Sequence, residues 1–187
     1  PFSFNWANAP VGDYVLTARA TDNLGLSVTS APIAVTLATA PPPQALGTWG
    51  SAWRYLDNGS DPGTAWRAVA FSDTAWSQGN AQLGYGETDQ ATTLATYGTG
   101  GQFTRAFYFR NQFVVTDPTL YKSLRLDLIM DDGAVVYLNG VEVFRGNMPA
   151  GTITYQSWAS VNGENTSAST NLPAGLQYAV EVRNPVI

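Results

Sequence analysis

The chain has 187 residues, enough for one large or two modest domains, and carries 14 acidic and nine basic residues for a net charge of −5. It contains no histidine and no cysteine, which excludes catalytic triads and cysteine–histidine dyads and nearly excludes a zinc site. The acidic balance also argues against nucleic acid as a partner, and no apolar run is long enough for membrane insertion.

Threonine, serine, glycine, asparagine and aromatic residues are abundant, whereas Lys122 is the single lysine. This composition is typical of secreted bacterial β-proteins, so we expect an extracellular or cell-surface location. The sequence begins at Pro1 within a strand-like segment. We therefore expect it to be a piece of a longer precursor.

The first part of the chain contains two β-rich runs, 15–21 and 33–37, and the first of them is followed by a turn at 22–25. Three consecutive prolines then impose an extended polyproline conformation and remove three backbone donors. The sequence therefore predicts a linker at 39–47 between a domain at 1–38 and a domain at 48–187.

Beyond the linker, alternating apolar residues predict further strands at 107–115, 124–130, 134–138, 141–144 and 178–182. Asn139-Gly140 lies between two of these runs and predicts a type I′ hairpin, in which both turn residues need positive φ. Asp131-Asp132-Gly133 predicts the turn before it. No segment has a convincing helical period, so we expect an all-β protein of two sandwich-type domains.

The segment from Phe2 to Leu37 resembles the second half of bacterial immunoglobulin-like repeats. The resemblance lies in Trp6, in Gly12-Asp13-Tyr14 leading into a strand, and in the Asp22-Asn23-Leu24-Gly25 turn. It implies a partial immunoglobulin-like β-sandwich, whose first strands would come from further sequence or from a neighbouring chain.

Residues 49–183 resemble the galactose-binding-like jelly-roll module of secreted bacterial multidomain proteins. The motifs that carry the resemblance are Trp53-Arg54-Tyr55-Leu56-Asp57-Asn58-Gly59, Trp66, Phe71-Ser72-Asp73-Thr74-Ala75-Trp76, Leu83-Gly84-Tyr85-Gly86, Tyr108-Phe109-Arg110 and the stretch 131–143. The segment is also similar to the jelly roll that precedes the catalytic barrel of β-galactosidase-type enzymes. Val182-Arg183 stands where the family usually has Val-His, and the family has one more strand after it.

Two loops are candidates for a structural calcium site, because hard cations need clustered carboxylate and carbonyl oxygens on a tight loop. The first candidate pair is Asp57 and Asp61, in a loop where the galactose-binding-like resemblance implies calcium. The second is Asp131 and Asp132, a hairpin that resembles the calcium-dependent lectin hairpin of yeast-type adhesins. The alternative is that these side chains bond their own backbone as turn residues.

Carbohydrate binding is the second candidate chemistry, since exposed aromatic rings stack on pyranoses while polar groups bind the hydroxyls. Trp66 and Trp76 are expected in the core. The candidate sugar-binding residues are Trp158, Tyr97, Tyr85 and Arg145. For the arginines as a group, pairing with the Asp-rich turns is the favoured alternative.

No spacing among the acidic residues singles out a pair for glycoside hydrolysis, so we do not expect an enzyme. The sequence favours a non-catalytic extracellular module, carbohydrate-binding or adhesive, in a larger secreted protein. Its partner would be a polysaccharide or a cell-surface glycan. The alternative is a structural subunit of an extracellular fibre, completed by strands from neighbouring copies of itself.

Overall fold

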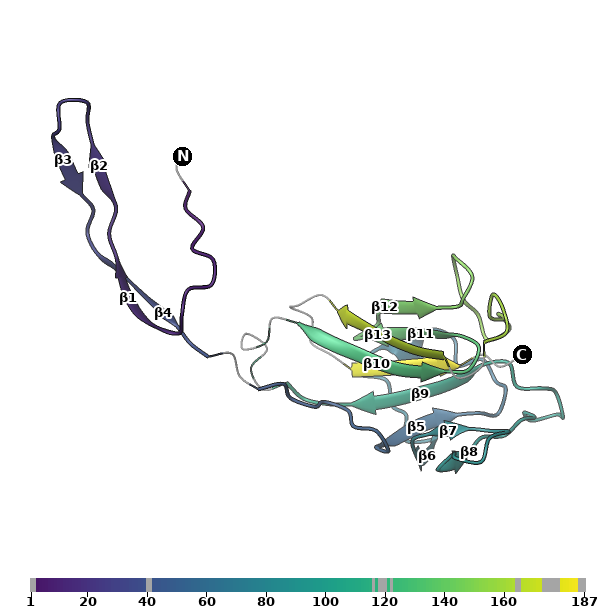
Figure 1. The fold of residues 1–187 in the computed structure, drawn as a ribbon. Coiled ribbons are helices and arrows are strands. Elements are labelled where there is room, and N and C mark those ends of the chain that lie inside the picture. The colour runs from purple at the N-terminus through teal and green to yellow at the C-terminus, as the bar shows by residue number, and fades with distance from the viewer. Residues whose placement is uncertain are drawn as a thin grey trace. The chain divides into compact units, whose positions relative to one another are not determined.

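The computed structural model describes residues 3–39, 42–115, 117, 121, 123–163 and 166–172, and the backbone of 179–184. The chain divides into two compact units, Pro1–Pro42 and Pro43–Ile187 (Figure 1). The fold is all-β, as predicted; within the described residues the only helical element is the single 3₁₀ turn η1, Ala65–Arg67. In this part of the chain no helix is long and apolar enough to cross a membrane.

The first unit consists of two antiparallel strand pairs. Strand β1 (Gly12–Leu16) pairs with β4 (Ile33–Leu37), and β2 (Arg19–Thr21) pairs with β3 (Ser27–Thr29). The run predicted at 15–21 is thus divided between β1 and β2. The predicted turn at Asp22 forms, because its carboxylate accepts hydrogen bonds from the backbone N–H groups of Leu24 and Leu26, each 2.9 Å long.

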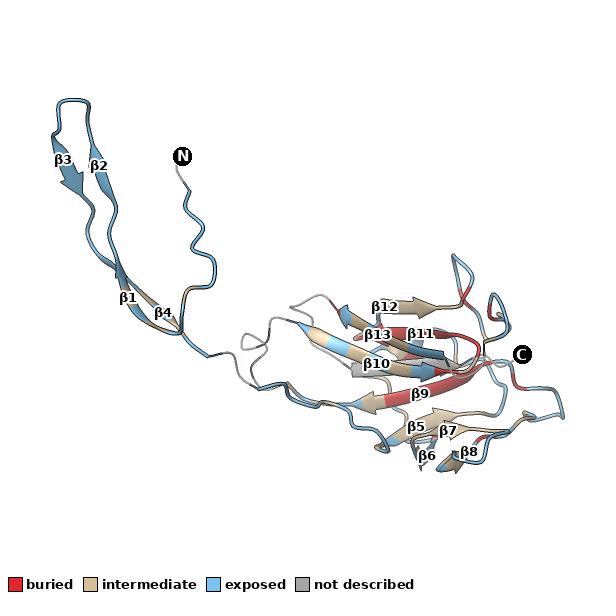
Figure 2. Ribbon diagram, viewed as in Figure 1, coloured by how far each residue is buried: buried red, intermediate tan, exposed pale blue. Residues whose placement is uncertain are grey.

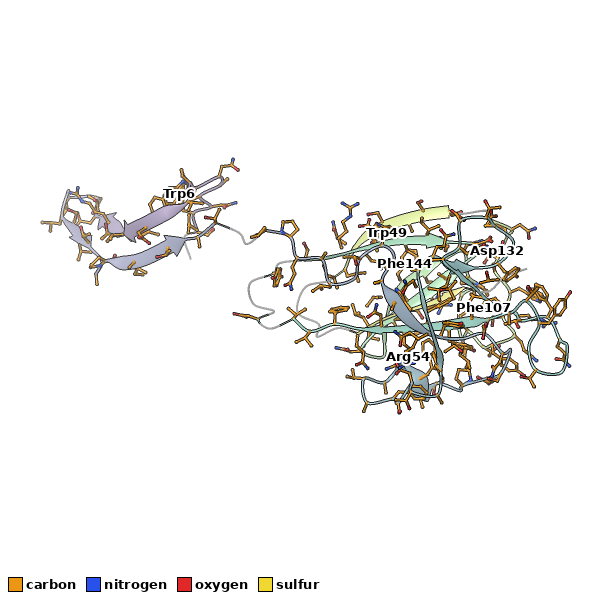
Figure 3. The ribbon with its side chains drawn as sticks, turned by 90° about the horizontal axis from the view of Figure 1, so that it is seen from below. Trp6, Trp49, Arg54, Phe107, Asp132 and Phe144 are labelled. Carbon is orange, nitrogen blue, oxygen red and sulfur yellow. The ribbon has the colours of Figure 1, made fainter. Side chains whose placement is uncertain are left out.

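None of the described residues in the first unit is buried (Figure 2). The exposed apolar side chains of this unit include Val15, Leu26, Val28 and Ile33. The rings of Trp6 and Tyr14 contact each other edge to face, with centroids 4.8 Å apart, and Figure 3 shows Trp6 beside the strands. Two strand pairs alone therefore leave their apolar side chains in contact with water.

The second unit is built on a six-stranded antiparallel sheet with the order β12-β11-β14-β9-β5-β6. In that order, the strands are Val141–Gly146, Ala134–Leu138, Ala179–Asn184, Phe107–Gln112, Ala52–Leu56 and Ser77–Asn80. Strand β9 is shorter than the predicted run 107–115. Strand β14 matches the predicted run at 178–182, of which Tyr178 lies outside the described residues.

Two smaller strand pairs accompany this sheet. Strand β10 (Leu124–Met130) pairs with β13 (Thr166–Leu172) antiparallel, and β7 (Leu83–Gly84) pairs with β8 (Thr92–Thr93) parallel. The end of β10 packs on β12, since a Cβ at Gly146 would lie 2.6 Å from the methyl carbon of Met130.

The core lies on both faces of β9, because successive side chains of a strand point to opposite faces. On one face, Tyr108 packs with Trp66 and Trp76, which are buried as predicted. On the other face, Phe107 and Phe109 pack with a second group of partly buried residues that includes Tyr85. Burial is concentrated along β9 and β11 (Figure 2).

The predicted hairpin is confirmed between β11 and β12. Asn139 and Gly140 both have positive φ, 49° and 83°, as a type I′ turn requires. Asp132 in the preceding turn also has positive φ, 55°. The hairpin brings Val135 opposite Arg145.

Candidate functional site

Several loops meet at one end of the second unit. Strands β5, β10 and β12 end there, and β9 and β11 begin there, because neighbouring strands of the sheet are antiparallel (Figure 1). Figure 3 shows Asp132 and Phe107 toward this end and Trp49 away from it. The loops involved are 57–63, 94–106, 131–133 and 147–163. We call this region the loop end.

An aromatic group lies at the loop end. Tyr97 is 63% exposed, and its ring centroid is 6.0 Å from that of Phe103, which is 37% exposed. The two residues form an antiparallel bridge, so the rings come from a small hairpin. Phe103 also contacts Tyr85, with centroids 6.5 Å apart. Two of the predicted sugar-binding residues, Tyr85 and Tyr97, are thus joined through a residue that sequence reasoning missed.

Arg105 extends this group toward Trp158. Thr104 and Ala106 are buried while Phe103 and Arg105 are exposed, so these last two face the same side of an extended segment. The guanidinium carbon of Arg105 lies 4.6 Å from the ring centroid of Trp158, which is 40% exposed. We call Tyr85, Tyr97, Phe103, Arg105 and Trp158 the loop-end cluster.

Tyr85 lies on the inner side of the cluster. Its ring packs 5.8 Å from Phe107, and its buried hydroxyl has no hydrogen-bond partner among the described residues. Burial, and then the charges of Asp131 and Asp132, raise the pKa of Tyr85 to about 12. Tyr85 therefore packs between the core residue Phe107 and the exposed Phe103, while Tyr97 is the most exposed ring of the cluster.

A glycine fixes the position of the Tyr97 loop. A Cβ at Gly98 would lie 2.3 Å from the carbonyl oxygen of Asn58, and the Thr99 N–H donates a 3.0 Å hydrogen bond to that same oxygen. Only glycine allows the two loops to approach so closely. The chain from Asp57 to Asp61 thereby positions Tyr97.

The carboxylates predicted to bind calcium at Asp57 and Asp61 make hydrogen bonds within the protein. Asp57 accepts a 2.8 Å bond from the backbone N–H of Ala95, and Asp61 accepts a 2.8 Å bond from that of Gly63. The side-chain oxygen of Asn58 accepts hydrogen bonds from the backbone N–H and the hydroxyl group of Ser60. Asp61 bonds a backbone N–H two residues ahead, as in the turn alternative, whereas the bond of Asp57 joins its loop to the segment at Ala95. Calcium binding at this pair stays a prediction.

The second predicted calcium pair lies beside the loop that carries Trp158. Asp132 is 6% exposed, and its carboxylate accepts a 2.9 Å hydrogen bond from the Gly163 N–H. The Asp132 N–H in turn donates to the Gly163 carbonyl, 2.8 Å away. Asp131 is close enough to affect Tyr85 electrostatically. Across the described ranges, no three acidic side chains gather in a group suited to a metal ion.

Arg145, the remaining predicted sugar-binding residue, is engaged by its own hairpin. Its Nε and Nη2 donate 2.7 Å hydrogen bonds to the two carboxylate oxygens of Glu142, and its Nη1 donates to the carbonyl oxygens of Pro149 and Gly151. The bond from Arg145 holds the pKa of Glu142 below its usual range. The structure thus places Arg145 as an anchor of the 147–151 loop.

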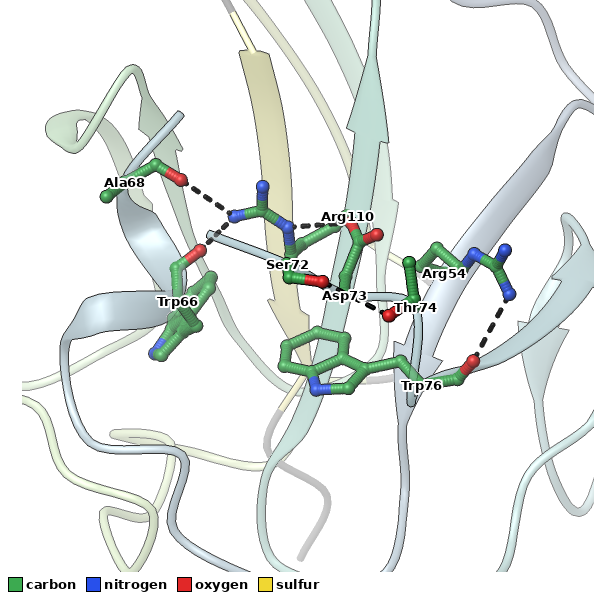
Figure 4. Close-up of polar contacts among 8 residues, drawn as sticks. All are labelled: Arg54, Trp66, Ala68, Ser72, Asp73, Thr74, Trp76 and Arg110. Atoms are coloured by element: carbon green, nitrogen blue, oxygen red, sulfur yellow. Dashed lines mark hydrogen bonds and ion pairs between the residues drawn. The ribbon is translucent and has the colours of Figure 1, made fainter. Parts of the chain in front are cut away.

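Arg110 illustrates the predicted pairing of arginines with Asp-rich turns (Figure 4). Its Nε lies 2.9 Å from an oxygen of Asp73, and its Nη1 donates to the carbonyl oxygens of Trp66 and Ala68. Arg54 bonds the carbonyl oxygen of Trp76 in the same region. This network holds the segment that covers one face of the sheet, and it takes no part in the loop-end cluster.

Comparisons with known proteins give few matches. No family model matches the chain, and no curated protein matches it. Two solved structures of Bacteroides uniformis beta-glucuronidase 2 are similar to it at 18% identity. One is covalently bound to cyclophellitol-6-carboxylate aziridine (TM-score 0.46), and the other is a calcium-binding mutant (TM-score 0.48). Each match covers 73% of this chain but only 14% of the enzyme chain.

Proposed function

We propose that the second unit is a non-catalytic carbohydrate-binding module of an extracellular protein. The observation that carries this proposal is the loop-end cluster, in which Tyr97 is 63% exposed beside Phe103, and Arg105 faces the same side of the chain as Phe103. Exposed aromatic rings stack on the apolar face of a pyranose, while arginine N–H groups bind its hydroxyls. Such a surface matches a polysaccharide or a cell-surface glycan.

A non-catalytic role is supported by what two carboxylates of the loop end do. Asp57 and Asp132 each accept a backbone hydrogen bond, and both bonds hold the loops in place. Hydrolysis of a glycoside would instead need two carboxyl groups facing each other across the ligand. The composition, with a single lysine and many threonine, serine and glycine residues, supports an extracellular location.

Affinity electrophoresis through gels that contain single polysaccharides tests the proposal. The wild-type protein is expected to be retarded by at least one of them, and Tyr97→Ala to bind about tenfold more weakly because a stacking ring is removed. Trp158→Ala should also weaken retention. The matched control is Trp49→Ala, since Trp49 is 71% exposed but lies outside the cluster.

The proposal fails if the wild-type protein is retarded by no polysaccharide. It also fails if Trp49→Ala and Tyr97→Ala weaken retention equally, because binding would then not depend on the loop-end cluster. Circular dichroism of each variant confirms that the fold is retained.

A second candidate function rests on the first unit, whose strands expose Val15, Val28 and Ile33. Exposed apolar strand edges favour pairing with another chain, as in fibres whose subunits exchange strands. Sedimentation velocity over a range of concentrations tests this candidate. Ordered oligomers that Val28→Lys disrupts would support it, whereas a monomer at every concentration would eliminate it.

A further inference from the structure

Arg105 keeps its hydrogen-bonding groups available. Other guanidinium groups at the surface are engaged, such as those of Arg145 with Glu142 and Arg125 with Asp127. Arg105 is exposed and stacked on Trp158, yet within the described residues it donates no hydrogen bond and forms no ion pair. The guanidinium group of Arg105 is therefore a charged donor at the surface whose N–H groups bond none of the described residues.

The contact with Trp158 determines how this donor is presented. A guanidinium above an indole ring is attracted by the ring's negative face, and its N–H groups project outward. The fork of N–H groups matches the two oxygens of a carboxylate, and such pairs are stronger than bonds between neutral groups. Trp158 thus acts by orienting Arg105, since the arginine covers part of its ring.

The exposed aromatic rings and Arg105 lie on one side of the same segment. Phe103 and Arg105 are two residues apart on the same side of an extended segment, a separation of roughly 7 Å, and Tyr97 lies against Phe103. A saccharide that stacks on the exposed rings of Tyr97 and Phe103 and continues along the same side of this segment would therefore bring a substituent to Arg105. In a uronic acid that substituent is a carboxylate.

We infer that the loop-end cluster prefers uronic acid units, with Tyr97 stacking on the pyranose and Arg105 binding the carboxylate. This inference rests on the carbohydrate-binding function proposed above. The charges near the cluster give the ligand a direction, because Asp131 and Asp132 lie on the Tyr85 side and repel an anion there. The ligand's carboxylate points toward Arg105 and its neutral hydroxyls toward Tyr85.

The test compares acidic polysaccharides with their own carboxyl-reduced forms, using polygalacturonate, alginate and hyaluronan. Wild-type protein is expected to bind one of the three about tenfold more tightly than its reduced form. Arg105→Gln should abolish that preference, so that the variant binds the acidic and the reduced form with equal affinity. Arg105→Lys, which keeps the charge but lacks the fork, should retain part of the preference.

Arg125→Gln is the matched control, because it removes the same charge from an exposed arginine on β10. Dextran sulfate distinguishes a carboxylate from a sulfate as the group bound. The inference is overturned if Arg125→Gln reduces the preference for the acidic form as much as Arg105→Gln does. It is also overturned if the wild-type protein binds dextran sulfate more tightly than the carboxylated polysaccharides. Equal binding of acidic and reduced forms overturns the inference but leaves the proposed function, whereas no binding to any polysaccharide overturns both.

Discussion

The side-chain amide of Asn147 donates a 2.8 Å hydrogen bond to the backbone carbonyl oxygen of Asp132. The same amide also donates to the carbonyl oxygen of Val161 and accepts a bond from its N–H. One side chain thus connects the turn before β11 with the loop that carries Trp158. The loop-end cluster depends on this connection because the loop has little regular structure of its own.

Replacing Asn147 by alanine should destabilise the protein by about 2 kcal/mol, since it removes these bonds and strains a residue whose φ is 50°. Asn147→Gly removes the bonds but tolerates the positive φ, so it should cost about 1 kcal/mol less. Urea denaturation measures both changes. Equal stability of the two variants would mean that the backbone conformation contributes nothing.

Removal of the Asp73 carboxylate should be costly. Asp73→Ala leaves the buried charge of Arg110 without its carboxylate partner, and loss of one member of a buried pair costs about 3 kcal/mol. Asp127→Ala breaks the exposed pair with Arg125 and should leave the stability nearly unchanged, because water screens that pair. Similar urea midpoints of unfolding for the two variants would contradict the prediction that the buried pair contributes more to stability than the exposed pair.

Acid should weaken the hairpin through Glu142, whose pKa is lowered by its hydrogen bond with Arg145. A carboxyl group with a depressed pKa in the folded state stabilises that state above its unfolded pKa of about 4.3. This stability is lost as the pH falls through the folded-state pKa. Glu142→Gln should therefore lose less stability than the wild-type protein between neutral and acidic pH, as followed by thermal unfolding.

Tyr85 should make the stability of the folded state fall at alkaline pH, whereas Glu142 makes it fall in acid. Its pKa is raised to about 12, so it stabilises the folded state below about pH 10, and this contribution is lost as the pH rises further. Tyr85→Phe should be as stable as the wild-type protein at neutral pH, because the buried hydroxyl has no partner among the described residues. Ultraviolet titration of the tyrosines should show one late-ionising group that the variant lacks.

Chelation of calcium should leave the melting temperature unchanged. The carboxylates of Asp57, Asp61 and Asp132 already accept backbone hydrogen bonds that organise their loops. Thermal unfolding in EDTA and in excess calcium measures the effect. A higher melting temperature in calcium, removed by Asp57→Ala or Asp132→Ala, would instead identify a metal site.

Local chemistry explains which parts of the fold could be predicted. The Asn139-Gly140 turn needs positive φ at both positions, and this requirement is visible in the sequence itself. Strand β13 was missed because its sequence, TSASTNL, alternates small polar residues and has no apolar period. It forms a strand because it pairs with β10, which supplies the apolar residues, and that pairing is not local.

Of the candidate site, the sequence could predict the exposed aromatic residues but not the arginine that lies beside one of them. Tyr97 and Trp158 were recognised as exposed aromatic residues, and both are exposed. Arg105 was expected to pair with an acidic turn, as Arg110 does with Asp73. Its contact with Trp158 joins two loops that are distant in sequence, and only the folded chain shows it.

The order of strands in the large sheet has a consequence for how the protein is made. Strand β14 lies between β11 and β9, although both neighbours are synthesised well before it. A ribosome-bound chain that lacks β14 therefore holds two half-sheets, β12-β11 and β9-β5-β6, each with a bare inner edge. The large sheet can be completed only after β14 has been synthesised. Until then the unpaired edges of β11 and β9 are the places where the nascent chain could pair with a wrong strand.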